Sequence, residues 1–344
     1  MTGGFDPGAL QRDHGDIDGE ADACRSSVAL FDFSFMHRAR IDGRDAIDLV
    51  QRLTPRPLGG LSIGRIAYAL RIDAAGHAVA DLTVWRVAAT TFEVFSGRAD
   101  EIETLQLFAA DVQATVAVLT AATSIFALQG PSCLRALATV ADADALRRLS
   151  YFAHVELDLA GVACRVGRLG YTGERGFEIV APRAGGDRLW ALLAQAARPA
   201  GFAAADILRI EAGFILFANE LRYPVTPAAL GLGRFAPAGA ERPHDVRLVC
   251  FKAECDTKPV LFRPMAGTIY PPAPGSMLIT SACHSTRADG VLGLALVRPR
   301  AAGLADVSGR FRSIAEVALP YFDNAKCRPR GTWRADLWPD DGTH

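Results

Sequence analysis

Hydrophobic and polar residues form a recurring order of elements in the first half of the chain. Residues 28–43 have the character of a strand-rich segment that ends in a turn at Gly43, and apolar residues then recur at helical spacing over 44–53. The same order of strand, glycine and helix returns at 124–140, where Gly130 takes the place of Gly43. The pattern therefore predicts a repeated strand–turn–helix unit.

A second pair of segments supports this repeat at almost the same offset. Residues 92–108 and 177–193 each run from a short strand through a loop into an amphipathic helix. Two nearly equal offsets predict a duplicated unit of antiparallel sheet and helices, which spans residues 21–120 and 121–235. The predicted fold class is therefore α+β.

The remaining segments differ from the repeat in composition and in their pattern of apolar residues. The first twenty residues are rich in Gly and Asp without periodicity, and FAPAGAERPHD at 235–245 is typical of a linker. From residue 246 onward short apolar strands alternate with turns, as in a small β-barrel or sandwich. We therefore expect four parts, namely a mobile arm (1–20), a first α+β lobe (21–120), a second α+β lobe (121–243) and a C-terminal β-barrel (244–344).

Composition and charge exclude several classes of protein. The 37 basic and 38 acidic residues give a formal net charge of -1, which lacks the positive excess of a general nucleic-acid binder. No stretch approaches the ~20 apolar residues that span a bilayer, and the first residues are too acidic and polar for a secretory signal. We expect a cytoplasmic protein without nucleic-acid or membrane partners. The seven cysteines form no CxxC pair and the histidines stand singly, so no metal site is predicted.

One glycine-rich segment, GRLGYTGERGFEI at 167–179, is a candidate ligand-binding site. Glycine at this density indicates special backbone dihedral angles or the close approach of a ligand. In the strand that follows, alternation places Phe177 and Ile179 on one face and Glu178 on the other. Glu178 therefore either faces solvent, as residue statistics favour, or directs a carboxylate into a cleft.

Two further charged residues stand in apolar surroundings. Arg209 lies within an apolar helix, where it either forms a structural ion pair with Glu211 or Asp206 or binds a ligand carboxylate. Asp81 interrupts the start of an apolar strand, at a position where a lone aspartate is usually a turn residue.

GLGRFA at 231–236 matches the GxGxxA fingerprint of dinucleotide-binding proteins. Its context contradicts that function, because Pro224, Pro227 and Pro237 flank it and no strand precedes it or helix follows it. We interpret it as a turn.

Taken together, these segments resemble the folate-dependent aminomethyltransferase family, which includes the T-protein of the glycine cleavage system. SSVALFDFSFM at 26–36 is similar to the family's SVGMFDVSHM, and GYTGERGFEI at 170–179 is similar to its GYTGEDGFE. LRIEAGFILFANEL at 208–221 resembles LRLEAG..LYG.EL, and segments after residue 280 look like the family's C-terminal barrel. The resemblance implies three lobes in a ring around a central hole that holds tetrahydrofolate.

The resemblance also implies roles for seven residues. Glu178 corresponds to the glutamate that holds the pterin, whose ring N–H and exocyclic amine are two parallel donors for a carboxylate. Asp81 corresponds to the catalytic aspartate, which would orient the reactive folate nitrogen and stabilise positive charge developing on the one-carbon unit. The other folate-binding residues implied are Met36, Tyr68 and Tyr171, which line the hole, and Arg209 and Arg328, either of which would receive the glutamate-tail carboxylates.

Several departures from the family lie where it meets the aminomethyl-lipoyl arm. Phe35 replaces a histidine, Ser96 replaces an asparagine, and LTPR at 53–56 stands in place of LTND. We therefore expect a tetrahydrofolate-dependent transferase of aminomethyl or methyl groups whose donor is a small molecule, with a carrier protein as a second option. The alternatives are an O-, N- or S-demethylase that yields methyltetrahydrofolate, and a folate-binding protein without catalysis.

Overall fold

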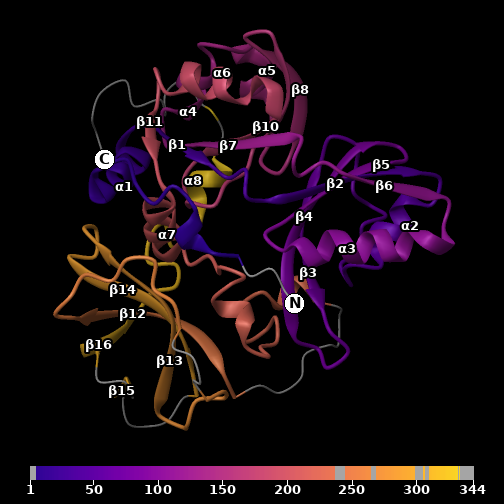
Figure 1. Cartoon of the computed structure of the whole chain (residues 1–344). Helices are drawn as coiled ribbons and strands as arrows, with labels where there is room; N and C mark the ends of the chain where they lie inside the picture. The colour runs from indigo at the N-terminus through magenta and orange to yellow at the C-terminus, as the bar shows by residue number, and fades with distance from the viewer. Residues whose placement is uncertain are drawn as a thin grey trace.

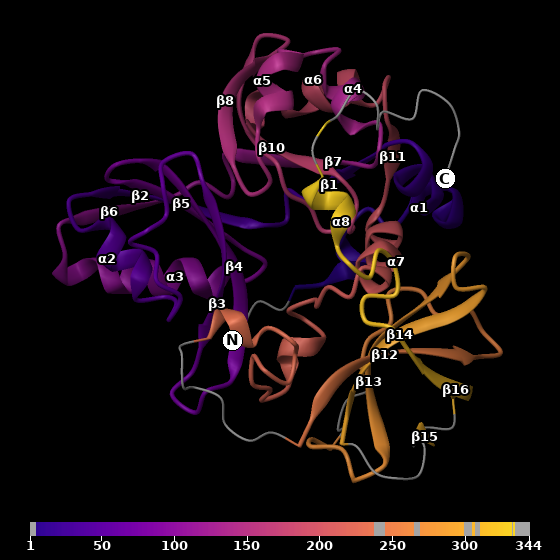
Figure 2. The ribbon, with the colours of Figure 1, turned by 180° about the vertical axis from the view of Figure 1, so that it is seen from behind.

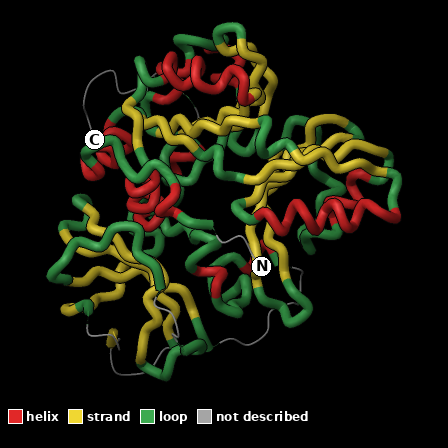
Figure 3. Tube along the Cα trace, in the orientation of Figure 1, coloured by secondary structure: helices red, strands yellow, loops and turns green. Residues whose placement is uncertain are grey.

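Each of the three lobes of the molecule contains its own β-sheet (Figures 1 and 3). The computed structural model describes residues 5–236, 245–264, 269–298, 305–306, 310–331 and 333. The predicted linker at 235–245 falls almost entirely outside the described residues. Helices lie against the sheets in the first two lobes, so the structure has the α+β class that the sequence predicts.

The first lobe is a five-stranded antiparallel sheet with two helices packed on one face. Its strands are β2 (His37–Gly43), β3 (Ile66–Ile72), β4 (Ala78–Ala88), β5 (Thr91–Ser96) and β6 (Ala114–Val118), in the spatial order β3-β4-β5-β2-β6. The helices are α2 (Ala46–Gln51) and α3 (Ala99–Phe108), which continues into η2 (Ala109–Asp111). Leu49 and Leu105 of these helices are fully buried against Phe92 and Val94 of the sheet.

The second lobe contains a six-stranded sheet and five helices. Its strands are β1 (Ala29–Asp32), β7 (Thr123–Gln129), β8 (His154–Leu159), β9 (Val162–Gly167), β10 (Gly176–Pro182) and β11 (Arg198–Ala200), in the order β11-β1-β7-β10-β9-β8. The helices are α1 (Ile17–Ser26), α4 (Cys133–Leu137), α5 (Ala143–Arg148), α6 (Arg183–Leu193) and α7 (Phe202–Glu211). All described pairings in this sheet are antiparallel except that of β1 with β11.

Four strands of each sheet have the same spatial order, which supports the predicted duplication. The order β3-β4-β5-β2 of the first lobe corresponds to β8-β9-β10-β7 of the second lobe, and the sheets differ beyond that point, with β6 in the first and β1 and β11 in the second. Gly43 and Gly130 occupy matching turns, with φ angles of 144° and 131°. A Cβ atom would lie 2.3 Å from the Gln113 carbonyl oxygen at the first glycine and 2.5 Å from the Ser27 carbonyl oxygen at the second.

The predicted boundary at the start of the first lobe is wrong because β1 belongs to the second lobe. β1 is inserted between β7 and β11, which lie about a hundred residues or more further along the chain. The first lobe therefore begins at β2. The alternation of apolar residues identifies β1 as a strand but carries no information about its distant partners.

The prediction of a mobile arm over residues 1–20 is wrong for the residues that the structure describes. η1 (Pro7–Ala9) and α1 form there, and the carbonyl oxygens of Gln11 and Arg12 accept hydrogen bonds from the amides of Phe202 and Ala203. Glu20 is fully buried, and its carboxylate accepts hydrogen bonds from the amides of His14 and Gly201. Gly201, Phe202 and Ala203 are far away in sequence, so local periodicity could not reveal these contacts.

The C-terminal lobe contains an open sheet in place of the predicted barrel. Its strands are β12 (Arg247–Glu254), β13 (Ser276–Ser285), β14 (Gly290–Val297), β15 (Ala305–Asp306) and β16 (Arg312–Val317), in the order β15-β13-β14-β12-β16. The described edges at β15 and β16 are not hydrogen-bonded to one another, so the described strands do not close. The short helix α8 (Cys327–Arg330) follows and returns to the second lobe (Figure 2).

None of the helices in the described part of the chain has both the length and the apolar character needed to cross a membrane.

Candidate functional site

A cavity of about 660 Å³ lies between the lobes and is lined by residues from widely separated parts of the chain. Its walls include residues of β3 and β4, of β10, of the segment 213–235 and of the α8 region. The segment 213–235 includes η3 (Glu220–Arg222) and η4 (Gly233–Phe235). The walls are rich in aromatic side chains, namely Phe33, Phe35, Tyr68, Phe95, Tyr151, Phe152, Tyr171, Phe202, Phe214, Phe217 and Phe235.

Five of the seven predicted site residues line this cavity. Met36 precedes β2, Tyr68 lies on β3, Asp81 on β4 and Glu178 on β10, whereas Tyr171 lies in the glycine-rich loop before β10. The structure thus brings residues of both predicted lobes to one space, as the resemblance implies.

Glu178 is a carboxylate without a protein partner. Its strand neighbours are Ala127 on β7 and Gly167 on β9, which are too small to cover it. Its side chain forms no hydrogen bond or ion pair with another described residue, and burial raises its pKa to about 7. Glu178 therefore faces the cavity, and the solvent-facing alternative that residue statistics favour does not hold.

Asp81 lies within a strand and is oriented by its neighbours. The Tyr68 hydroxyl donates a hydrogen bond of 3.4 Å to Asp81 Oδ2, and the Ser96 hydroxyl donates to the Asp81 carbonyl oxygen at 3.2 Å. Burial raises the pKa of Asp81 to about 6, while the Tyr68 hydrogen bond acts in the opposite direction. Asp81 is thus a second cavity carboxylate and not a turn residue.

The glycine-rich loop packs around one buried amide. The Gln129 side chain donates hydrogen bonds to the carbonyl oxygens of Leu169 and Phe177. A Cβ atom would lie 1.8 Å from this side chain at Gly170 and 2.2 Å from it at Gly176. The glycines are therefore required for the close approach of the loop to Gln129, which sets the path of the chain into β10.

Tyr171 presents a ring rather than a free hydroxyl to the cavity. Its hydroxyl donates a 2.5 Å hydrogen bond to the Ile215 carbonyl oxygen, and its ring stacks on Phe214 with centroids 6.0 Å apart and an interplanar angle of 15°. These contacts fix the ring plane.

Arg209 does not line the cavity. The guanidinium is fully buried, and it donates to Asp206 at 2.9 Å, to Glu220 at 3.3 Å and to the Ser281 hydroxyl at 2.6 Å. These two carboxylates raise its pKa against the effect of burial. The structural ion pair, which the sequence left open as an alternative, is therefore the correct interpretation, with Glu220 as an additional partner.

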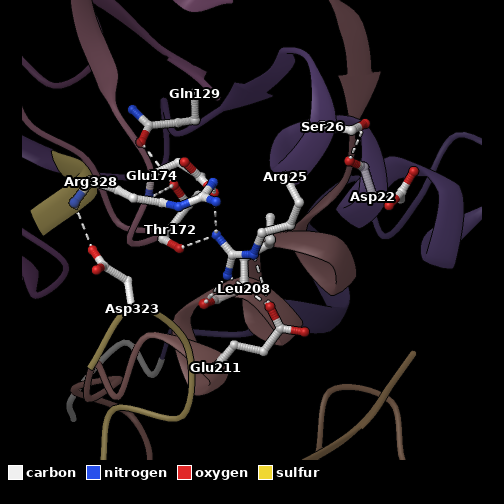
Figure 4. Close-up of polar contacts among 10 residues, drawn as sticks. All are labelled: Asp22, Arg25, Ser26, Gln129, Thr172, Glu174, Leu208, Glu211, Asp323 and Arg328. Carbon is white, nitrogen blue, oxygen red and sulfur yellow. Dashed lines mark hydrogen bonds and ion pairs between the residues drawn. The ribbon is translucent and has the colours of Figure 1, made fainter. Parts of the chain in front are cut away.

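Arg328 is also directed away from the cavity. It donates from Nη1 to Glu174 Oε1 at 2.9 Å, and its amide donates to Asp323 Oδ2 at 2.7 Å (Figure 4). Arg25 lies 3.6 Å from the same Glu174 oxygen and binds Glu211 at 2.8 Å. Glu174 therefore binds the Arg328 side chain, which is not among the residues that line the cavity.

Sequence reasoning missed the basic residues that do line the cavity. They are Arg56, Arg65, Arg234, Lys326 and Arg330. Arg234 lies in the GLGRFA segment, where residues 233–235 form the short helix η4 in place of the predicted turn, and Arg56 lies in the LTPR segment at 53–56. These positions are far apart in sequence and follow no periodic pattern, so only the folded structure shows that they lie together.

Known proteins share extended similarity with this chain. The GCVT N-terminal domain model matches residues 5–238. An aminomethyltransferase from Listeria monocytogenes serotype 4a is 34% identical over 220 residues, which are 63% of this chain and 60% of that relative. An aminomethyltransferase from Streptomyces avermitilis is 30% identical over 331 residues, which are 88% of this chain and 89% of that relative.

The fold is also that of a solved structure. The glycine cleavage system aminomethyltransferase T from Bartonella henselae superposes with a TM-score of 0.71 at 22% identity, over 90% of each chain. The chain spans 60% of the length of the Listeria relative and most of the Streptomyces relative. Since the family model covers well over half of the chain and the Streptomyces alignment most of it, this protein belongs to the GCVT N-terminal domain family.

Proposed function

We propose that this protein is a tetrahydrofolate-dependent one-carbon transferase that binds the folate in the central cavity, with the three lobes around it. The partnerless carboxylate of Glu178 is the observation that carries the proposal. Glu178 is partly exposed to the cavity and has no protein hydrogen-bond donor, so a ligand that donates to this carboxylate would be favoured there. The ring N–H and exocyclic amine of a pterin are two parallel donors that suit its two oxygens.

The remaining walls fit the rest of a folate. Ligand cavities typically have volumes of roughly 300–1,000 Å³, and this one has about 660 Å³. The ring of Tyr171 is fixed on Phe214, and Tyr68 packs edge-on against Phe235 with centroids 5.0 Å apart. Flat aromatic surfaces of this kind, together with the soft thioether of Met36, would enclose the pterin and the aminobenzoyl ring.

Asp81 is the residue that we assign to the chemistry. The hydrogen bond from Tyr68 fixes one carboxylate oxygen, and a pKa of about 6 leaves the group mostly ionised at neutral pH. Tetrahydrofolate supplies the nitrogen that accepts the one-carbon unit. The negative charge of Asp81 would orient that nitrogen and stabilise positive charge that develops beside it.

We further infer that the one-carbon donor is a small molecule and not an aminomethylated lipoyl carrier. Phe35 lies in an aromatic cluster, with its ring centroid 5.0 Å from Phe5 and 5.6 Å from Phe202. Ser96 is fully buried, and its hydroxyl donates a hydrogen bond to the Asp81 carbonyl oxygen. The cavity wall at Phe35 is therefore apolar, whereas the aminomethyltransferase family has a histidine at this position. This difference favours a one-carbon donor other than the aminomethylated lipoyl carrier.

Calorimetry with tetrahydrofolate tests the binding site. Glu178→Gln places an amide N–H opposite one pterin donor, so the affinity should fall roughly ten- to a hundred-fold, which corresponds to about 1.5–3 kcal/mol. Glu103→Gln, which removes an exposed carboxylate from α3, is the matched control and should bind like the wild type. Equal affinity of Glu178→Gln and the control would show that Glu178 does not bind the pterin.

A donor screen tests the reaction. Aminomethylated lipoyl carrier and a panel of methylated small amines, ethers and thioethers would each be incubated with protein and tetrahydrofolate. We expect folate products with the small molecules only. Efficient release of ammonia and methylenetetrahydrofolate from the carrier would refute the inferred donor. Methyltetrahydrofolate as the product would identify a demethylase, and binding without turnover of any donor would refute the transferase.

A further inference from the structure

The edge strands of the three described sheets differ in how well they are protected against further strand pairing. Unpaired main-chain groups on an edge can bind another strand, and proteins usually prevent this with charged residues, proline or very short edges. In the described part of the chain β3, β8, β11, β15 and β16 have such protection. It consists of Arg71 on β3, of His154, Glu156 and Asp158 on β8, of Arg198 and Pro199 on β11, of a length of two residues at β15, and of Arg312 and Glu316 on β16. The remaining edge, β6, has the sequence ATVAV and none of these features.

The register of β6 identifies the main-chain groups that face outward. Residues 114–118 pair with residues 43–39 of β2, and the Leu119 amide donates to the Arg38 carbonyl oxygen at 2.9 Å. Hydrogen-bonded and non-hydrogen-bonded pairs alternate in an antiparallel ladder, so the main-chain groups of residues 115 and 117 also face β2. Those of Ala114, Val116 and Val118 therefore point away from the sheet, and none of them has a partner among the described residues.

The side chains of β6 present no charge to an added strand. Val116 packs against the core beneath α2 and α3, whereas Thr115 and Ala117 are exposed on the other face of the sheet. Their cross-strand neighbours on β2 are Asp42 and Arg40, which form an ion pair with each other at 2.8 Å. A strand added at this edge would therefore meet no unpaired charge from β2 or β6.

We infer that β6 pairs antiparallel with β6 of a second copy of this chain, about a two-fold axis at Val116. In this register Val116 lies opposite Val116 and Ala114 lies opposite Val118, so the outward amides and carbonyl oxygens of both strands are all paired. Thr115 lies opposite Ala117 on the other face. A two-fold interface joins the same surface of both copies and leaves neither β6 edge free, so the assembly closes as a dimer with one continuous sheet through both first lobes.

Exposed apolar side chains lie at the ends of the inferred strand pair. Val118 is 49% exposed, and the pairing places it opposite Ala114 of the second copy. Ala114 follows η2 and the end of α3, where Leu107 is 76% exposed. The pairing thus brings Val118 of one copy toward the end of α3 in the other, where burial of apolar surface adds to the main-chain hydrogen bonds. The first lobe extends away from the C-terminal lobe, which does not cover β6 (Figures 1 and 2).

Sedimentation velocity over about a hundred-fold range of concentration, up to roughly 0.2 mM, tests the inference. The chain has a mass of 36.7 kDa, and we expect a reversible dimer of twice that mass whose fraction rises with concentration. A single strand pair is a small interface, so the dimer should be weak. A wild-type protein that remains monomeric over the whole range would overturn the inference.

Charged variants of β6 test the register of the pairing. Thr115→Lys/Ala117→Lys places lysines opposite one another across the axis, so the dimer should dissociate roughly 3- to 30-fold more readily. Thr115→Lys/Ala117→Glu is the matched control, because each lysine then faces a glutamate of the second copy and the dimer should be at least as tight as the wild type. Mixing Thr115→Lys/Ala117→Lys with Thr115→Glu/Ala117→Glu should restore a dimer. Equal dimer affinity of the double-lysine and lysine–glutamate variants would overturn the inference.

Val116→Pro tests the main-chain hydrogen bonds. Proline removes the outward amide of residue 116 and leaves the hydrogen bonds between β2 and β6 intact. Because both copies lose an amide at the axis, dimer affinity should fall roughly 5- to 100-fold, whereas the control Val116→Ala keeps the amide and should still dimerise. Urea unfolding shows whether Val116→Pro stays folded, and an unchanged dimer in the folded variant would refute the pairing. If this variant does not fold, the comparison of the lysine and glutamate variants decides the result.

Discussion

The Glu178→Gln variant should be more stable than the wild type in the absence of ligand, because the native site holds a carboxylate that burial disfavours. The pKa of Glu178 rises from 4.5 to about 7 on folding. One pKa unit corresponds to about 1.4 kcal/mol, so an ionised Glu178 lowers the free energy of unfolding by about 3 kcal/mol at most. The amide of glutamine is itself poorly hydrogen-bonded there, and we therefore expect a net gain of about 1–3 kcal/mol at pH 8.

The sign of the pH dependence follows from the two pKa values. Below pH 4.5 the carboxyl is protonated in both the folded and unfolded states, so it contributes no pH-dependent difference. Between pH 4.5 and about 7 the folded state binds more protons, and the wild type loses stability as the pH rises. The stability difference between the variant and the wild type should therefore grow over this window and stay constant above it.

Urea unfolding of the ligand-free proteins at half-unit steps from pH 4.5 to 8.5 measures this difference. Glu103→Gln, at an exposed position, should show a flat difference over the same range. A stability difference for Glu178→Gln that does not change with pH would refute the reasoning, and so would a loss of stability that is largest at pH 8. Together with the weakened folate binding, a gain in stability would show that the site sacrifices stability for binding.

Three further predictions concern single residues. Asp81→Asn should leave tetrahydrofolate affinity almost unchanged and lower turnover by roughly 10²–10³-fold, and wild-type kcat/KM should fall as the pH drops below about 6; unchanged turnover would refute the catalytic role. Arg209→Met leaves Asp206 and Glu220 buried without their cation, so urea unfolding should show a loss of about 3–5 kcal/mol, while folate affinity of the folded protein persists. Gly170→Ala forces a Cβ atom against Gln129 and should cost about 1–3 kcal/mol in the same assay; a neutral result would mean that the loop can shift freely.

The local elements and the internal repeat were predictable from sequence because each depends on residues close together in the chain. The strand–glycine–helix order around Gly43 and Gly130 appears in the structure at both places, as do β5–α3 and β10–α6. The five cavity residues were found only through the resemblance to a family. Alternation places Glu178 on the opposite strand face from Phe177 and Ile179 but cannot show what lies against that face, and residue statistics favoured solvent.

The remaining features depend on contacts between distant segments. The attachment of residues 5–20 to the start of α7 combines main-chain hydrogen bonds with contacts of Glu20 and Phe5, and all of these partners lie far away in sequence. Arg209 and Arg328 are close in sequence to residues that line the cavity, but each forms an ion pair with a nearby carboxylate. Among the described residues, Lys326 and Arg330 have no such carboxylate partner, and both line the cavity. Whether a basic side chain pairs with a carboxylate or lines the cavity depends on where Glu174 and the other acidic residues lie in the folded protein, which the sequence pattern does not show.

The insertion of β1 between β7 and β11 has a consequence for the order in which the protein folds. The first lobe, from β2 to β6, is one continuous segment and can fold as soon as the ribosome releases it. β1 is synthesised earlier but pairs with strands at 123–129 and 198–200, so it must wait while the whole first lobe emerges. At about 5–20 residues per second, that interval lasts several seconds or more, during which the apolar segment 29–31 is unpaired. We therefore expect truncated chains that end before residue 123 to contain a folded first lobe and an exposed, aggregation-prone β1.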